Sequence, residues 1–216
     1  DSIGDRSPVR FRRRWWLLIS GLVLIASSLI TARLSNTHPG APSACTDSSL
    51  CFRATKQNVF PDYGNTYPSN LADCMFAAAA NWQTIVLGTT PPEKQVETEY
   101  LAAAASSSSG VDEDLFLWWW STKGIGDIKV TGWTLLSQIN EERIKAEIRQ
   151  HRAIFAVFTF HRNATVAGQH VEPGGHAAII DGYTAEGPLV VTWGHTYQMT
   201  WGEYWKSINS IRAITR

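Results

Sequence analysis

A cysteine at the start of an alanine-rich helix is the feature that most constrains this chain. In the stretch 71–82, Asp73 is a good N-cap residue, and the residues after Cys74 are strong helix formers. Cys74 is thereby placed where unsatisfied backbone N–H groups and the helix dipole favour a thiolate, the form that attacks carbonyl carbons. The charge of Asp73 opposes this effect. Cys74 is therefore either a nucleophile or a small buried residue in a helix that we expect to end near Gly88.

The other two cysteines leave two disulfide arrangements open. Cys45 and Cys51 lie close together in the sequence, and a bridge between them in an oxidising compartment leaves Cys74 as a thiol. That bridge closes a short loop, so its stabilisation of the fold is modest. A bridge from Cys74 to either of the others is the alternative, and it removes the nucleophile.

The N-terminal part of the chain predicts a membrane anchor. A basic stretch, residues 1–14, is expected to be a cytoplasmic tail, and the apolar segment 15–34 is expected to be a transmembrane helix or signal anchor. A cleaved secretory signal is the alternative, but its apolar region is usually shorter. We therefore expect a single-pass protein of the cell membrane with its main domain extracytoplasmic, or a secreted protein if the segment is cleaved.

The remainder divides into an irregular lead-in and one domain. Residues 35–70, rich in Ser, Thr, Pro and Asn at first, are expected to form a stalk and lead-in, and 71–216 a single domain. Helices come first and strands second, which predicts an α+β fold. Beyond the first helix we expect helices over 91–105, 112–122 and 141–150, extended chain over 127–136, strands over 153–160, 176–183 and 188–193, a polar loop over 161–173, and mixed polar and aromatic chain over 201–216.

Charge and aromatic content limit the partners. The formal net charge is +0, so nothing global points to nucleic acid. Three consecutive tryptophans, Trp118, Trp119 and Trp120, cannot all face one way, so part of this cluster is expected to line a groove or an interface. A membrane-protein complex is one setting for such contacts.

Three motifs together resemble the papain-like cysteine peptidases. They are Cys74-Met75-Phe76-Ala77, the strand from His176 to Tyr183 that follows Gly174-Gly175, and Trp193-Gly194 with Trp201-Gly202-Glu203. The combination of Asp-Cys, Gly-Gly-His and Thr-Trp-Gly is most similar to divergent bacterial and phage members. The resemblance implies a helical half followed by a β-rich half, with the cysteine and the histidine meeting across a cleft between them.

The resemblance also implies roles for individual residues. Cys74 would be the nucleophile and His176 the base and acid, acting on peptide or amide bonds of a peptide or protein substrate, with no cofactor and no metal. Spacing from His176 places Thr192 where the family has its orienting Asn, whereas alignment on the following tryptophan gives Val191. Asn70 is the amide nearest to the family's oxyanion Gln. The alternatives are an inactive papain-like module that binds a peptide, and an accessory subunit of a membrane complex.

The other polar residues have ordinary interpretations. His161, His170 and Glu172 match no zinc spacing and are interpreted as loop residues. His195 is expected at the surface. Asp181 either pairs with a base or caps a turn before Gly182. If the resemblance holds, Trp193 shields the cysteine–histidine pair from water.

Overall fold

The structure is a computed structural model that describes residues 52–53, 71–104, 110–137 and 140–216. All described residues lie within one compact unit of the chain, 39–216. Among them, no helix combines the length and the apolar character that a membrane crossing needs. The predicted tail and anchor, the Cys45–Cys51 bridge and Asn70 all lie outside the described residues.

The first helix begins and ends where the sequence predicts. Helix α1 spans Cys74–Trp82 and continues as a π-helical turn, η2, over Gln83–Leu87. Gly88 follows with φ of 74°, a left-handed conformation that glycine adopts at little cost and that stops the helix.

The next two helices lie within the ranges that the sequence predicts, and the second has a side-chain cap. Helix α2 spans Glu93–Ala103 directly after Pro92, and α3 spans Glu113–Thr122. Asp112 precedes α3, and its carboxylate accepts hydrogen bonds from two N–H groups of the first turn. The predicted helices over 91–105 and 112–122 are therefore confirmed within the described residues.

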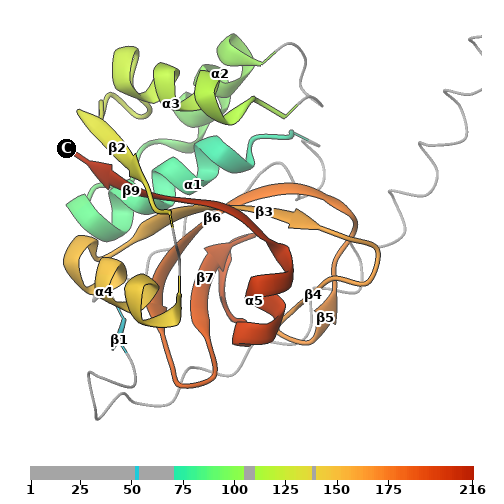
Figure 1. The fold of residues 1–216 in the computed structure, drawn as a ribbon. Coiled ribbons are helices and arrows are strands. Elements are labelled where there is room, and N and C mark those ends of the chain that lie inside the picture. The colour runs from blue at the N-terminus through green and yellow to red at the C-terminus, as the bar shows by residue number, and fades with distance from the viewer. Residues whose placement is uncertain (1–51, 54–70, 105–109, 138–139) are drawn as a thin grey trace, which may run out of the picture. The chain divides into compact units, whose positions relative to one another are not determined.

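The second half of the chain forms a seven-stranded sheet with an appended hairpin (Figure 1). Its strand order is β2-β9-β3-β6-β7-β8, with β1 pairing to the end of β6, and each recorded pairing is antiparallel. The strands are β1 (Phe52–Arg53), β2 (Gly132–Leu135), β3 (Ile154–Phe160), β6 (Gly174–Tyr183), β7 (Pro188–Thr192), β8 (His195–Gln198) and β9 (Ile208–Thr215), and the hairpin is β4 (Thr165–Val166) with β5 (Gln169–His170).

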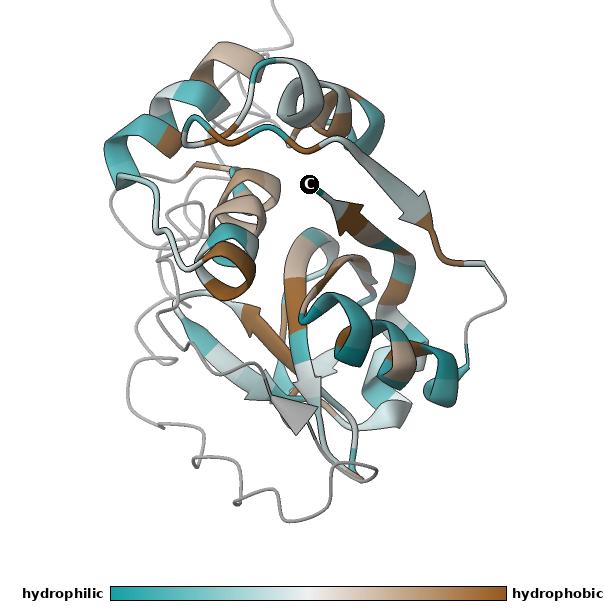
Figure 2. Cartoon of the chain, turned by 90° about the vertical axis from the view of Figure 1, so that its left-hand side faces the viewer, coloured by the Kyte–Doolittle hydropathy of each residue, from teal (hydrophilic) through white to brown (hydrophobic). Residues whose placement is uncertain are grey.

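Both faces of β6 are buried, which explains its nearly continuous apolar sequence. On one face Ala177 and Ile179 join the apolar cluster that contains α1. On the other face Ala178 and Ile180 join a cluster that contains residues of α4 (Glu141–His151) and α5 (Trp201–Ser207). Figure 1 shows α1 on one side of the sheet and α4 and α5 on the other, and Figure 2 shows brown, apolar segments along the inner strands. The sheet is therefore the centre of the domain.

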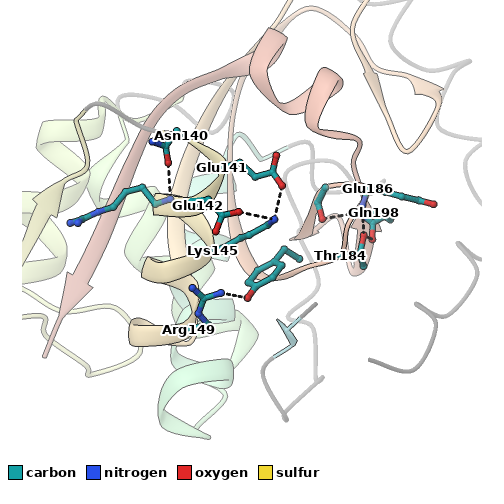
Figure 3. Close-up of polar contacts among 11 residues, drawn as sticks. Asn140, Glu141, Glu142, Lys145, Arg149, Thr184, Glu186 and Gln198 are labelled. Carbon is teal, nitrogen blue, oxygen red and sulfur yellow. Dashed lines mark hydrogen bonds and ion pairs between the residues drawn. The ribbon is translucent and has the colours of Figure 1, made fainter. Parts of the chain in front are cut away.

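Polar contacts hold α4 against the far end of β6 (Figure 3). Asn140 caps α4 by accepting from the Arg143 N–H at 2.9 Å. Lys145 Nζ donates to Glu141 Oε1 at 2.5 Å and lies 5.6 Å from the centre of the Tyr183 ring. The Tyr183 hydroxyl in turn accepts from Arg149. These contacts fix the end of β6, and the candidate catalytic histidine, His176, lies near the beginning of the same strand.

Two segments differ from the sequence prediction. The predicted loop 161–173 contains the β4–β5 hairpin, and the segment 201–216, described from the sequence only as mixed polar and aromatic chain, forms α5 and β9. Helix α5 begins with a capping box, in which Thr200 and Glu203 satisfy each other's backbone N–H groups. Strand β9 lies between β2 and β3, so its conformation follows from two partners that are distant in sequence.

Glu203 also ties α5 to the β4–β5 hairpin. One carboxylate oxygen accepts from the Thr165 hydroxyl at 2.7 Å and from the Gly168 N–H at 2.9 Å, and the other accepts from the Thr200 N–H at 2.8 Å. Burial raises the pKa of Glu203, but these hydrogen bonds to Thr200, Thr165 and Gly168 together outweigh it and hold the pKa below its usual value.

We expect Glu203→Gln to lower the free energy of unfolding by about 1 kcal/mol near neutral pH, because charge-assisted hydrogen bonds are lost. A lowered pKa in the folded state adds stability above the usual glutamate pKa, and this stability disappears as the pH falls through the lowered value. The difference from wild type in urea titrations should therefore shrink below about pH 4. Glu186→Gln, at an exposed carboxylate, is the control. A difference that does not depend on pH would contradict this assignment.

Candidate active site

Cys74 is the first residue of α1, and its side chain is a half-buried thiol. The alternative in which Cys74 forms a disulfide is therefore wrong. Asp73 caps the helix through its carbonyl, which accepts from the N–H groups of Phe76 at 2.8 Å and Ala77 at 3.0 Å. Its side chain makes no capping hydrogen bond, because its backbone, with φ of −95° and ψ of 14°, is not in the extended conformation usual for that contact. The helix start is as predicted, but the side-chain cap is not.

His176 lies near the beginning of β6 and is held by Thr192 on the neighbouring strand β7. The His176 Nε2 and Thr192 Oγ1 atoms are 2.5 Å apart, and both residues are buried. The register explains the contact: Ile180 pairs with Val190, so Thr192 lies one pair further along on the same face of the sheet as His176. The hydrogen bond fixes the imidazole through one of its two ring nitrogens.

Val191 lies on the opposite face of the sheet, in the apolar cluster that includes Ile179 and α1. Successive residues of a strand alternate between faces, so only one of Thr192 and Val191 can reach His176. Of the two alignments that the sequence left open, the structure matches the one based on spacing from His176.

Trp193 covers the imidazole of His176. The two rings are stacked with centroids 4.6 Å apart and planes 25° apart. Trp193 and Gly194 have φ of 48° and 74° and form the tight turn between Thr192 and His195, which pair with each other. A bulky residue pays an energetic cost at positive φ, and strain of this kind often marks a functional site. Here the strained turn places an indole over the His176 imidazole.

The two elements that carry Cys74 and His176 pack against each other. Helix α1 contacts β6, and Figure 1 shows both elements beginning toward the same side of the domain. Beside His176, Gly174 and Gly175 are exposed, and a Cβ atom at either position would meet nothing within 4 Å. The backbone next to the histidine is therefore open to an approaching chain.

The other polar residues match their predictions only in part, because His170 lies in strand β5 and not in a loop, and Asp181 lies inside strand β6 and not at a turn. His161, His170 and His195 are exposed, and within the described residues there is no group of three or more acidic, histidine or cysteine side chains that could hold a metal ion. Asp181 is buried within β6, at the point where its register with β7 shifts.

The tryptophan cluster splits as predicted. Trp118 is 49% exposed, whereas Trp120 is fully buried in the core beside α1. Whether the exposed part contacts a partner stays a prediction.

No sequence signal singles out Tyr100, which the structure places at the entry to the cysteine helix. Its hydroxyl accepts a hydrogen bond from the Ala72 N–H at 3.2 Å. This residue lies on α2, remote from Cys74 in the sequence, and belongs to none of the motifs above.

Comparison with solved structures identifies the fold. Xylellain, a cysteine protease from Xylella fastidiosa, is similar with a TM-score of 0.57 and 12% identity, over 77% of this chain and 85% of that chain. Digestive procathepsin L 3 from the larval midgut of Tenebrio molitor is similar with a TM-score of 0.54 and 9% identity, over 83% and 73% of the two chains. Both are papain-like proteins, so the predicted papain-like fold, with a helical part followed by a sheet, is confirmed. No protein-family model matches the sequence, and no match is found among curated proteins.

Proposed function

We propose that this protein is a thiol hydrolase that cleaves peptide or amide bonds through Cys74 and His176. The observation that carries the proposal is the buried imidazole of His176, hydrogen-bonded to Thr192 and covered by Trp193, in a papain-like fold where its strand packs against the helix that Cys74 begins. The turn that places Trp193 over His176 has an energetic cost, and strain of this kind clusters at functional sites, which supports a catalytic role for His176.

The proposed reaction follows from proton affinities. The Cys74 thiolate attacks the carbonyl carbon, and as the C–N bond breaks His176 gives its proton to the leaving amine, which leaves a thioester on the sulfur. His176 then takes a proton from water as the water oxygen attacks the thioester carbonyl; the C–S bond breaks, the carboxylic acid leaves, and the Cys74 thiolate and protonated His176 are restored. Thr192 engages Nε2, and we assign the exchange of the proton with the sulfur to the other ring nitrogen, Nδ1.

As the sulfur attacks, negative charge develops on the carbonyl oxygen, and hydrogen-bond donors must stabilise it. The backbone N–H of Cys74 lies in the first turn of α1, where N–H groups have no partner within their own helix. We assign the second donor to the side chain of Asn70, on its position in the sequence shortly before the cysteine.

The similar structures agree with this chemistry, since one is named a cysteine protease and the other a procathepsin. The location of the reaction follows from the sequence alone: we propose that segment 15–34 anchors the chain in the membrane with residues 71–216 on the extracytoplasmic side. Substrates would then be peptides or proteins outside the cytoplasm.

Cleavage of a peptide mixture tests the proposal. The full-length protein is incubated with peptides of varied sequence, and new termini are identified by mass spectrometry. We expect new termini with wild type, and none with Cys74→Ala or after alkylation of Cys74. Cleavage that survives Cys74→Ala would contradict the proposal. A complete lack of cleavage by folded wild type would favour the inactive, peptide-binding module.

A further inference from the structure

Tyr100 joins α2 to the chain segment that leads into Cys74. The phenol ring is fully buried and packs edge-on against Phe76, with ring centroids 5.8 Å apart and planes at 72°. Its hydroxyl oxygen accepts from the N–H of Ala72, two residues before the cysteine. One side chain from α2 thus contacts the chain on both sides of Cys74.

The hydrogen bonds at the start of α1 show why the contact between Tyr100 and Ala72 matters. A helix start is usually fixed by a side-chain oxygen at the N-cap, but the Asp73 side chain makes no such bond. The carbonyl of Asp73 organises the residues after Cys74, through the N–H groups of Phe76 and Ala77. The Ala72 amide, on the other side of the cysteine, is held by Tyr100.

The pKa of the Tyr100 hydroxyl responds to the groups around Cys74. Burial raises the pKa of Tyr100, the hydrogen bond from Ala72 lowers it, and the negative charges of Asp73 and Cys74 raise it further. Tyr100 is thus a neutral phenol at neutral pH, and it lies within electrostatic reach of both groups. Because its side chain is fully buried, it does not touch a substrate.

We propose that Tyr100 is a positioning residue that sets the location of Cys74 by anchoring the Ala72 amide, an inference that rests on the proposed role of Cys74 as nucleophile. Without the hydroxyl, the segment entering α1 loses its anchor to α2. The sulfur then moves relative to the first-turn N–H groups and to His176. Displacements of this kind are costly to reaction rates even when they are small.

The test compares Tyr100→Phe with a matched tyrosine variant. Tyr204 on α5 is also fully buried and edge-on to a phenylalanine, at 6.1 Å from Phe158. Its hydroxyl has no hydrogen-bond partner within the part of the chain that the structure describes. Both substitutions keep the ring and remove only the hydroxyl, so Tyr204→Phe controls for the loss of a buried hydroxyl away from Cys74.

The measurement is the rate constant of Cys74 alkylation by iodoacetamide as a function of pH, on full-length protein. We expect Tyr100→Phe to lower the rate constant near neutral pH about 10-fold. We also expect it to move the midpoint of the profile to higher pH, because the helix N–H groups no longer align with the sulfur. Tyr204→Phe should match wild type.

Three outcomes would overturn the inference, and one of them identifies a failure of the proposed function. If wild-type Cys74 reacts no faster than it does in urea-unfolded protein, the proposed nucleophile itself fails. If wild type is reactive and Tyr100→Phe has the same rate constant and midpoint, only the role of Tyr100 fails. If Tyr100→Phe loses the native near-UV circular dichroism spectrum, the hydroxyl is a structural element and not a positioning one.

Discussion

Replacement of His176 by alanine is expected to lower the alkylation rate of Cys74 near neutral pH by about 100-fold. The expected loss has two causes: the sulfur loses its proton acceptor, and the thiolate loses the imidazolium that stabilises it. The measurement is iodoacetamide labelling followed by intact mass and peptide mapping, which assigns the added mass to one of the three cysteines. Peptide cleavage should fall in parallel.

The matched control is His195→Ala. His195 lies only a few residues from Thr192, at the start of β8, but its side chain is exposed. We expect its loss to leave the labelling rate unchanged. Equal labelling of wild type and His176→Ala, with both proteins folded, would show that Cys74 reacts as an ordinary thiol.

Thr192→Val is expected to reduce labelling and cleavage by about 10- to 100-fold without abolishing them. Valine has nearly the shape of threonine but lacks the hydroxyl, so the buried Nε2 of His176 loses its partner. The stacked rings of Trp193 and Phe160 still contact the imidazole, but stacking does not fix its rotation as the hydrogen bond to Thr192 does. The same two assays, run side by side, measure the effect.

Thr192→Ser is the matched control, because it keeps the hydroxyl and removes only a methyl group. We expect its activity to stay within a few-fold of wild type. If Thr192→Val and Thr192→Ser were equally active, the hydrogen bond between His176 and Thr192 would have no part in the reaction.

Local sequence rules sufficed for much of the fold. The starts of α3 and α4 follow from Asp112 and Asn140, whose side chains cap those helices, and the end of the first helical segment follows from Gly88. Strand β3 is apolar over nearly its whole length, and it lies inside the sheet as that pattern indicates.

Segments that depend on distant partners could not be predicted in this way. Strand β9 contains polar and charged residues, and it is a strand because β2 and β3 pair with it on both sides. The β4–β5 hairpin is short and polar, and Glu203, more than thirty residues further on, fixes it. The residues of β9 and of the β4–β5 hairpin alone therefore do not predict these strands.

The sequence named both residues of the contact between His176 and Thr192, but it gave no sign of the contact between Tyr100 and the cysteine helix. Of the two alignments that the resemblance left open, the one based on spacing from His176 named Thr192, which lies beside His176 on one face of two paired strands. Tyr100 reaches the cysteine helix from another helix, and only the packing of α1 with α2 shows this contact.

The most direct test of the account is the distance from Cys74 Sγ to His176 Nδ1 in a crystal structure of the protein. Both proposals require these two atoms in one site, with Nε2 of the same ring on Thr192. We predict a separation within about 4 Å, which allows for loose geometry without a substrate. A sulfur buried in the core of the helical part, away from the imidazole, would contradict the account.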